Sequence, residues 1–325
     1  MAQAPFLVLL VLSAAQTQAQ GPRELSPIPV PADRLQSLSL ETSKMSALQA
    51  AIQNHDYAKA EDLLAKEAVR DSQSQRLLLL LADVLFLDGK QLNVVVVLKK
   101  AELLGALDER SRLLLALAYV SIGRKNLAIS EFERLEEANP SSAVYPYWLS
   151  RLTYRKTDLQ QALAYAQKAV RIDAAFAKAH DQLGLCYAGL GENEQAIEAY
   201  KRAIRLNQEQ SLHWPWPAMN LGTLYLRLDR LAEAEGSLRN SIAIEPQFPL
   251  AHFRLGQVLE KQEHWDEASL ELKEAARLDP TYPEPHYALA RIYKRQKDMP
   301  AAEQELSLFE KLRSADKHKG ITRPD

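Results

Sequence analysis

The stretch that decides the fold is Leu183-Gly184-Leu185-Cys186-Tyr187, followed by Ala196, Tyr200 and Ala203. The same residue types return at the same spacing along nearly the whole chain, with a period of 34 residues. Fixed periods of 20 to 50 residues are typical of arrays in which each unit buries its apolar surface against its neighbours. The sequence therefore predicts a repeat protein.

Eight blocks of this period fit the chain, with one four-residue insertion, Ser211-Leu212-His213-Trp214, before the sixth block. The predicted repeats cover residues 41–74, 75–108, 109–142, 143–176, 177–210, 215–248, 249–282 and 283–316. The first block is the least regular of the eight. Residues 20–40 form a proline-rich leader before the array, and residues 317–325 form a short tail after it.

Each block pairs a bulky apolar column with a column of small residues. Position 8 of successive blocks, counted from the first residue of each block, is Ala82, Ala116, Ser150, Gly184, Gly222, Gly256 and Ala290 from the second block onward. Position 20 is alanine in seven of the eight blocks, the exception being Val94. At helical spacing these columns place a notch on a first helix and let the backbone of a second helix approach it. No run of β-branched residues alternates with polar ones, so the array is predicted to be all-α.

The repeat resembles the tetratricopeptide repeat family, whose motif has Leu-Gly, Tyr, Ala, an aromatic residue, Ala and a final Pro at these positions. The resemblance covers residues 41–316. It implies a right-handed superhelical solenoid of about eight helix-turn-helix repeats. It also implies that the first helices line a concave groove, which this family uses to bind peptides or partner proteins.

The first 19 residues differ from the rest of the chain. An apolar run, Phe6–Leu12, is followed by small and polar residues that end at Ala19, as in a signal peptide, although no Lys or Arg precedes the run. The run is shorter than the roughly 20 residues that span a bilayer. We therefore expect an exported protein, periplasmic or secreted, without stable membrane insertion. A cytoplasmic regulator or assembly factor whose N-terminus mimics a signal is the alternative.

Composition argues against several classes of function. A net charge of −2, from 40 basic and 42 acidic residues, disfavours a nucleic-acid partner, so an RNA-reading helical repeat ranks last. The sequence shows no catalytic or phosphate-binding motif, and we expect neither an enzyme nor a cofactor. The single cysteine, Cys186, is interpreted as a core residue. His180, His252 and His286 share position 4, but neighbouring helices lie too far apart for three such residues to bind one metal ion.

A column of cations is the strongest candidate for a binding site. Position 13 carries Arg155, Arg227, Lys261 and Arg295, and position 9 adds Arg151 and Arg291; we call these six residues the basic stripe. Position 5 adds Tyr147, Met219, Phe253 and Tyr287. In the family that the sequence resembles, positions 9 and 13 face the groove, so an acidic or extended segment of a protein or peptide is the predicted ligand. The alternative is that the cations complement the dipoles of their helices in solvent.

Two tryptophans beside the insertion form a second candidate surface. Trp214 and Trp216 lie in the segment His213–Pro217, and exposed tryptophans are effective binding anchors. The alternative is that Pro215 and Pro217 begin a helix while the rings cover the junction between repeats five and six. The run Val94–Val97 is predicted to be the buried face of a second helix. The sequence carries no indication of the oligomeric state.

Overall fold

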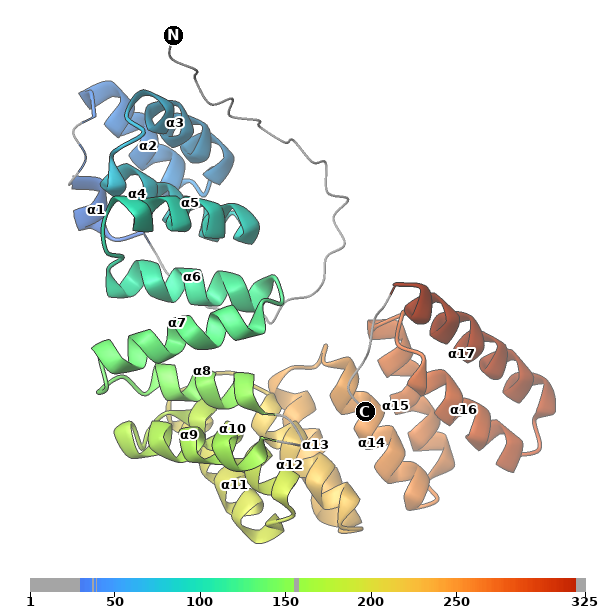
Figure 1. Cartoon of the computed structure of the whole chain (residues 1–325). Coiled ribbons are helices and arrows are strands. Elements are labelled where there is room, and N and C mark those ends of the chain that lie inside the picture. Colours follow the sequence, from blue (N-terminus) through green and yellow to red (C-terminus); the bar gives the residue numbers. More distant parts are fainter. Residues whose placement is uncertain (1–29, 37, 39, 155–157, 320–325) are drawn as a thin grey trace. The chain divides into compact units, whose positions relative to one another are not determined.

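The computed structural model describes residues 30–36, 38, 40–154 and 158–319, and Figure 1 shows their helices in chain order. The described residues form 17 α-helices and no strand. The predicted signal peptide, most of the leader and the end of the tail lie outside the described residues. The prediction of an all-α array of helical hairpins is confirmed.

After the short helix α1 (Ala32–Gln36), the helices follow one another as eight pairs. The first helices of the pairs are α2 (Thr42–Gln53), α4 (Gln75–Leu87), α6 (Glu109–Ser121), α8 (Val144–Thr153), α10 (Ala177–Leu190), α12 (Trp216–Arg227), α14 (Pro249–Lys261) and α16 (Glu284–Arg295). The second helices are α3 (Tyr57–Arg70), α5 (Gln91–Leu104), α7 (Lys125–Ala138), α9 (Leu159–Ile172), α11 (Asn193–Glu209), α13 (Leu231–Ile244), α15 (Trp265–Leu278) and α17 (Met299–Lys319).

The chain divides into two compact units, and the division falls within α7, between Glu131 and Phe132. In the first unit, α3 packs between α2 and α4, and α6 contacts both helices of the pair α4 and α5. In the second unit, the second helices α9, α11, α13 and α15 pack on the first helix of their own pair and on the first helix of the next pair, and α17 packs on α16. The first helices α8, α10, α12, α14 and α16 also contact one another in succession. Each pair is therefore stabilised by its neighbours, as in a solenoid.

The small residues at position 8 bring the two helices of a pair together. A Cβ atom added to Gly222 would lie 2.6 Å from Cγ of Leu238 and 3.2 Å from the carbonyl oxygen of Ala234. In the fourth pair, Ser150 Oγ donates a hydrogen bond of 2.7 Å to the carbonyl of Ala162. The alanine at position 20 thus approaches the notch as the sequence predicts. The side chain that fills the notch belongs to position 24, which is Leu238 in the sixth pair and Tyr200 in the fifth.

The turn within each pair ends the first helix with a left-handed residue at position 15. The seven described residues at this position have φ between 57° and 81°, and they are His55, Gly89, Gly123, Gly191, Asp229, Glu263 and Lys297. The N–H of the next residue bonds back to the carbonyl of position 11, as from Arg230 to Tyr225 at 2.9 Å. This bond is the mark of a Schellman turn, in which glycine is the least strained residue at the left-handed position.

The interpretation of Val94–Val97 as a buried face is corrected. Val94 is buried, whereas Val96 is 62% exposed. An α-helix turns by about 100° per residue, so four consecutive side chains cannot share one face. The interpretation of Cys186 as a core residue is confirmed, because its side chain is fully buried and burial raises the pKa of the thiol. Among the described helices, none is both long and apolar enough to cross a membrane.

Candidate protein-binding surfaces

The three described cations at position 13 lie at or near the ends of their first helices and reach back to the preceding pair. Arg227 Nη2 donates to the carbonyl of Ala188 at 3.1 Å and to Asn193 Oδ1 at 3.3 Å. Lys261 Nζ lies 2.8 Å from Asp229 Oδ1, in the turn between α12 and α13. Arg155 lies outside the described residues. The position-13 cations therefore contact the turn region of the preceding pair. The sequence predicted that they face either a ligand or solvent, and neither interpretation includes this contact.

Arg295 makes the same kind of contact through an aromatic ring. Its guanidinium carbon lies 5.4 Å from the ring centroid of Trp265, the first residue of α15 in the preceding pair. Such cation–π contacts at exposed sites contribute about 0.5–1 kcal/mol. The position-13 side chains thus help to hold successive pairs in register, while Lys261 remains 51% exposed and accessible to a ligand.

The two cations at position 9 lie beside aromatic rings of their own helices. Arg151 is stacked over Trp148 at 4.8 Å and donates from Nη1 to the hydroxyl of Tyr147 at 3.2 Å. Arg291 Nη2 lies 2.5 Å from Glu260 Oε2 of the preceding first helix, and its side chain is 48% exposed. The guanidinium carbon of Arg291 also lies 5.6 Å from the ring centroid of Tyr287, so both position-9 cations lie over aromatic rings and Arg291 makes an exposed ion pair as well.

Three of the four position-5 residues do not form the exposed surface that we expected beside the stripe. Tyr147, Met219 and Phe253 are buried, whereas Tyr287 is 45% exposed. The physical reason is the aromatic residue that precedes the next first helix. Phe176 covers Tyr147 at a ring distance of 5.1 Å. Tyr282 covers Phe253 in the same way, at 5.2 Å. Of these four residues, Tyr287 offers the most side-chain surface to a partner.

Trp214, at the end of the insertion, and Trp216, just after it, contribute to the packing of the array. The Trp214 N–H donates to Asn207 Oδ1 at 3.2 Å, and the Trp214 carbonyl accepts from Asn207 Nδ2 at 3.0 Å. The ring of Trp216 meets Phe248 edge-on, with centroids 4.9 Å apart. Pro217 lies in the first turn of α12, where its missing N–H is tolerated. This geometry fits the packing interpretation, and partner binding by these two residues stays a prediction.

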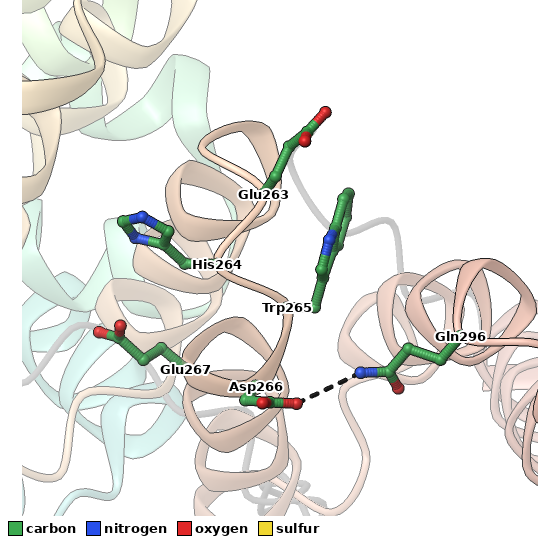
Figure 2. A pocket seen from close by; sticks show the side chains of 6 residues that line it. All are labelled: Glu263, His264, Trp265, Asp266, Glu267 and Gln296. Atoms are coloured by element: carbon green, nitrogen blue, oxygen red, sulfur yellow. Dashed lines mark hydrogen bonds between the residues drawn. The ribbon is translucent and has the colours of Figure 1, made fainter.

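A shallow pocket of about 300 Å³ lies at the turn between α14 and α15 (Figure 2). Its lining residues are Glu263, His264, Trp265, Asp266, Glu267 and Gln296. Gln296 Nε2 donates to Asp266 Oδ1 at 3.3 Å, which joins two successive pairs across the pocket (Figure 2). The lining is acidic and open to solvent, and one of the lining residues, Trp265, also contacts the position-13 cation Arg295.

The three position-4 histidines bind nearby groups of the array: His252 and His286 contact glutamates of their own repeats, and His180 contacts the end of the preceding repeat. His252 Nδ1 lies 2.6 Å from Glu271, and His286 Nδ1 lies 2.6 Å from Glu305. His180 Nε2 bonds to the carbonyl of Ala174 at 3.0 Å. Burial lowers the pKa of His180. Burial acts in the same direction on His252, but the hydrogen bond to Glu271 and its charge outweigh it and raise the pKa of His252. Within the described part of the chain, no three histidine, cysteine or carboxylate side chains gather as metal ligands would.

Models of the tetratricopeptide repeat match residues 113–179, 177–210 and 261–297. The helix pairs, their left-handed turns and these matches define the class: the described part of the chain is an all-α solenoid of tetratricopeptide-like helical hairpins.

Among curated proteins, the anaphase-promoting complex subunit cut9 of Schizosaccharomyces pombe is 28% identical over 224 residues, covering 67% of this chain and 32% of that protein. The BBSome complex member bbs-4 of Caenorhabditis elegans is 25% identical over 150 residues, covering 43% of this chain and 31% of that protein. The aligned regions thus span about a third of these relatives.

Solved structures share the fold at low sequence identity. A tetratricopeptide repeat protein from Parabacteroides merdae has a TM-score of 0.63 at 14% identity, over 80% of this chain and 99% of that one. The pilF protein of Pseudomonas aeruginosa has a TM-score of 0.56 at 18% identity, over 63% of this chain and 91% of that one. These likenesses support the arrangement of the helices.

Proposed function

We propose that the protein is a non-enzymatic scaffold that binds an acidic, extended segment of a partner protein along the basic stripe of the second unit. The observation that carries this proposal is the recurrence of exposed cations on successive first helices that contact one another. Packed helices lie about 8–10 Å apart, which matches about three residues of an extended peptide at roughly 3.3 Å each. One acidic side chain in every three would therefore meet one cation per repeat.

The named relatives favour a role in protein assembly. Two of them are described as members of multi-protein complexes, the anaphase-promoting complex and the BBSome. The bridges that the stripe makes to preceding turns are compatible with binding, because side chains that stay about half exposed can exchange one acceptor for another.

The test is capture by the mature chain, followed by mass spectrometry and titration of the captured partner. The double variant Arg227→Glu, Lys261→Glu should lose capture, and the parent's binding should weaken as salt rises, because exposed charges are screened within about 8 Å at physiological ionic strength. The matched control is Arg239→Glu, Arg277→Glu, which reverses two exposed cations on the second helices α13 and α15. Equal capture by both double variants would contradict the proposal.

We propose further that the protein is exported and that its mature form begins at Gln20. The support is the signal-like pattern of residues 1–19 and the small residues Thr17 and Ala19 before the expected cleavage. Intact mass of the exported form tests the cleavage site. Recovery of the full-length chain from cytosol alone would favour the alternative, a cytoplasmic regulator or assembly factor with the same binding mode.

A further inference from the structure

The segment that precedes the repeats binds to the first unit through a single arginine. Helix α1 packs against α4, and Arg34 Nη1 donates to Asp83 Oδ2 at 2.6 Å and to the carbonyl of Leu79 at 3.3 Å. Arg34 Nη2 donates to both oxygens of Asp108, at 2.8 and 2.7 Å, and to Ser111 Oγ at 2.7 Å. The guanidinium therefore joins the first helices of two successive repeats, α4 and α6.

The groups that receive Arg34 are also held by the repeats themselves. Asp83 is 1% exposed, and its Oδ1 accepts from Arg110 Nε at 2.9 Å. Asp108 caps α6 by accepting from the Ser111 N–H at 2.7 Å. Burial raises the pKa of Asp83, against the effect of the two guanidinium groups. A buried carboxylate needs cations to offset its desolvation, and a bidentate guanidinium is well matched to the pair Asp83 and Asp108.

The segment itself buries little. None of the residues of α1 is buried, and the hydrogen bonds described above join this segment to the array through the side chain of Arg34. Leu79 and Asp83 occupy positions 5 and 9 of their repeat, the same positions that carry Tyr287 and Arg291 in the eighth repeat. The first unit thus presents, at equivalent positions, a site of the opposite charge from the basic stripe.

We propose that Asp83, Asp108 and Ser111 form a docking site for an arginine-bearing extended segment of a partner protein, and that residues 30–36 occupy this site in cis until that segment displaces them. This site is separate from the basic stripe in both position and charge. Occupancy in cis fits a segment that is joined to the array by only a few residues, because a short tether gives it a high effective concentration. Displacement is feasible because one guanidinium supplies most of the polar contacts.

The test uses the full chain with Arg34→Ala as the receptor and a fluorescein-labelled peptide of residues 28–40 as the probe, followed by fluorescence anisotropy. The variant should bind the peptide at least tenfold more tightly than the parent chain, whose own segment competes. Adding Asp83→Asn, or Asp108→Asn in a separate variant, should weaken that binding at least tenfold. A peptide with alanine in place of the arginine should not bind.

Equal binding of the peptide by the parent and Arg34→Ala chains would overturn the proposal. Equal binding of the arginine-containing peptide and the peptide with alanine in its place would overturn it too. In either case Arg34 serves only to pack α1 onto the array. If Arg34→Ala loses helicity, Arg34→Lys takes its place as the receptor, because a single ammonium cannot form the bidentate contact. The same two outcomes then decide the question.

Discussion

Because the two helices of each pair approach closely at the notch, we expect two glycine-to-alanine substitutions in one repeat to change stability in opposite directions. Gly222 lies in α12, where an added Cβ would sit 2.6 Å from Leu238 Cγ, 3.0 Å from Leu238 Cδ2 and 3.2 Å from the carbonyl oxygen of Ala234. Favourable carbon contacts lie at about 3.5–4.0 Å, so the two helices must separate or Leu238 must leave its position. Gly236, in the paired helix α13, has no atom within 4 Å of an added Cβ.

The magnitudes follow from these distances. Replacing glycine by alanine within a helix stabilises by about 0.5–1 kcal/mol, and Gly236→Ala should show that gain alone. Overpacking a tight core costs about 1–3 kcal/mol, so Gly222→Ala should be destabilised by a net of about 1–2 kcal/mol. The backbone oxygen of Ala234 is the main obstacle, because it cannot rotate away as the end of a side chain can.

The assay is urea unfolding followed by far-ultraviolet circular dichroism for the parent and both variants. The midpoint should fall for Gly222→Ala and rise for Gly236→Ala, with the slope of the transition unchanged. If Gly222→Ala is as stable as Gly236→Ala, the helices do not meet at position 8 and the packing described for the repeat is wrong.

Three further predictions concern the same unit. The pKa of His252 is raised above its unfolded value of about 6.5, so the stability that its contact with Glu271 contributes is complete below pH 6.5 and is lost as the pH rises through the folded pKa. Glu271→Gln should flatten this decline in melting temperature with pH. An unchanged pH profile in thermal melts would contradict the prediction. Glu263→Gly should stabilise by about 0.5–1 kcal/mol, because φ at this position is 64°, and a lower urea midpoint would argue against strain there. Arg295→Ala should lose about 0.5–1 kcal/mol with its contact to the Trp265 ring, and an unchanged urea midpoint would show that this contact contributes nothing measurable.

The sequence predicts the fold well because the determinants of the hairpin recur in register. Leucine, a small residue and alanine at fixed positions report the contact between two helices, and eight copies make the pattern hard to miss. The residue of the second helix that fills the notch is harder to predict from the sequence. Position 24 varies from Leu238 to Tyr200 to Ala166, so its column has no single residue type even though all three side chains are buried.

The candidate site was less predictable, because it depends on contacts between repeats. Burial of Tyr147 and Phe253 follows from aromatic residues that precede the next first helix, and position within a repeat does not report this covering. Arg34 lies 49 residues from Asp83 in a proline-rich segment without periodicity. Its charge was visible in the sequence, but no spacing rule joins it to its acceptors.

The contacts of the position-13 cations could not be predicted from the sequence either, because they too run between repeats. Their recurrence was evident, and both sequence interpretations treated each cation as facing either a ligand or solvent. The bonds from Arg227 to Asn193 and from Lys261 to Asp229 run to the preceding pair, a geometry that appears only when hairpins are stacked.

Site-specific photo-crosslinking shows directly whether the partner binds to the first helices of the second unit, as we propose. A benzophenone amino acid placed at Tyr287 in α16, which is 45% exposed, is compared with one at Leu270 in the second helix α15, which is 67% exposed. We expect a covalent adduct with the captured partner from position 287 and none from position 270. An adduct from position 270 alone, or from neither position while capture persists, would contradict it.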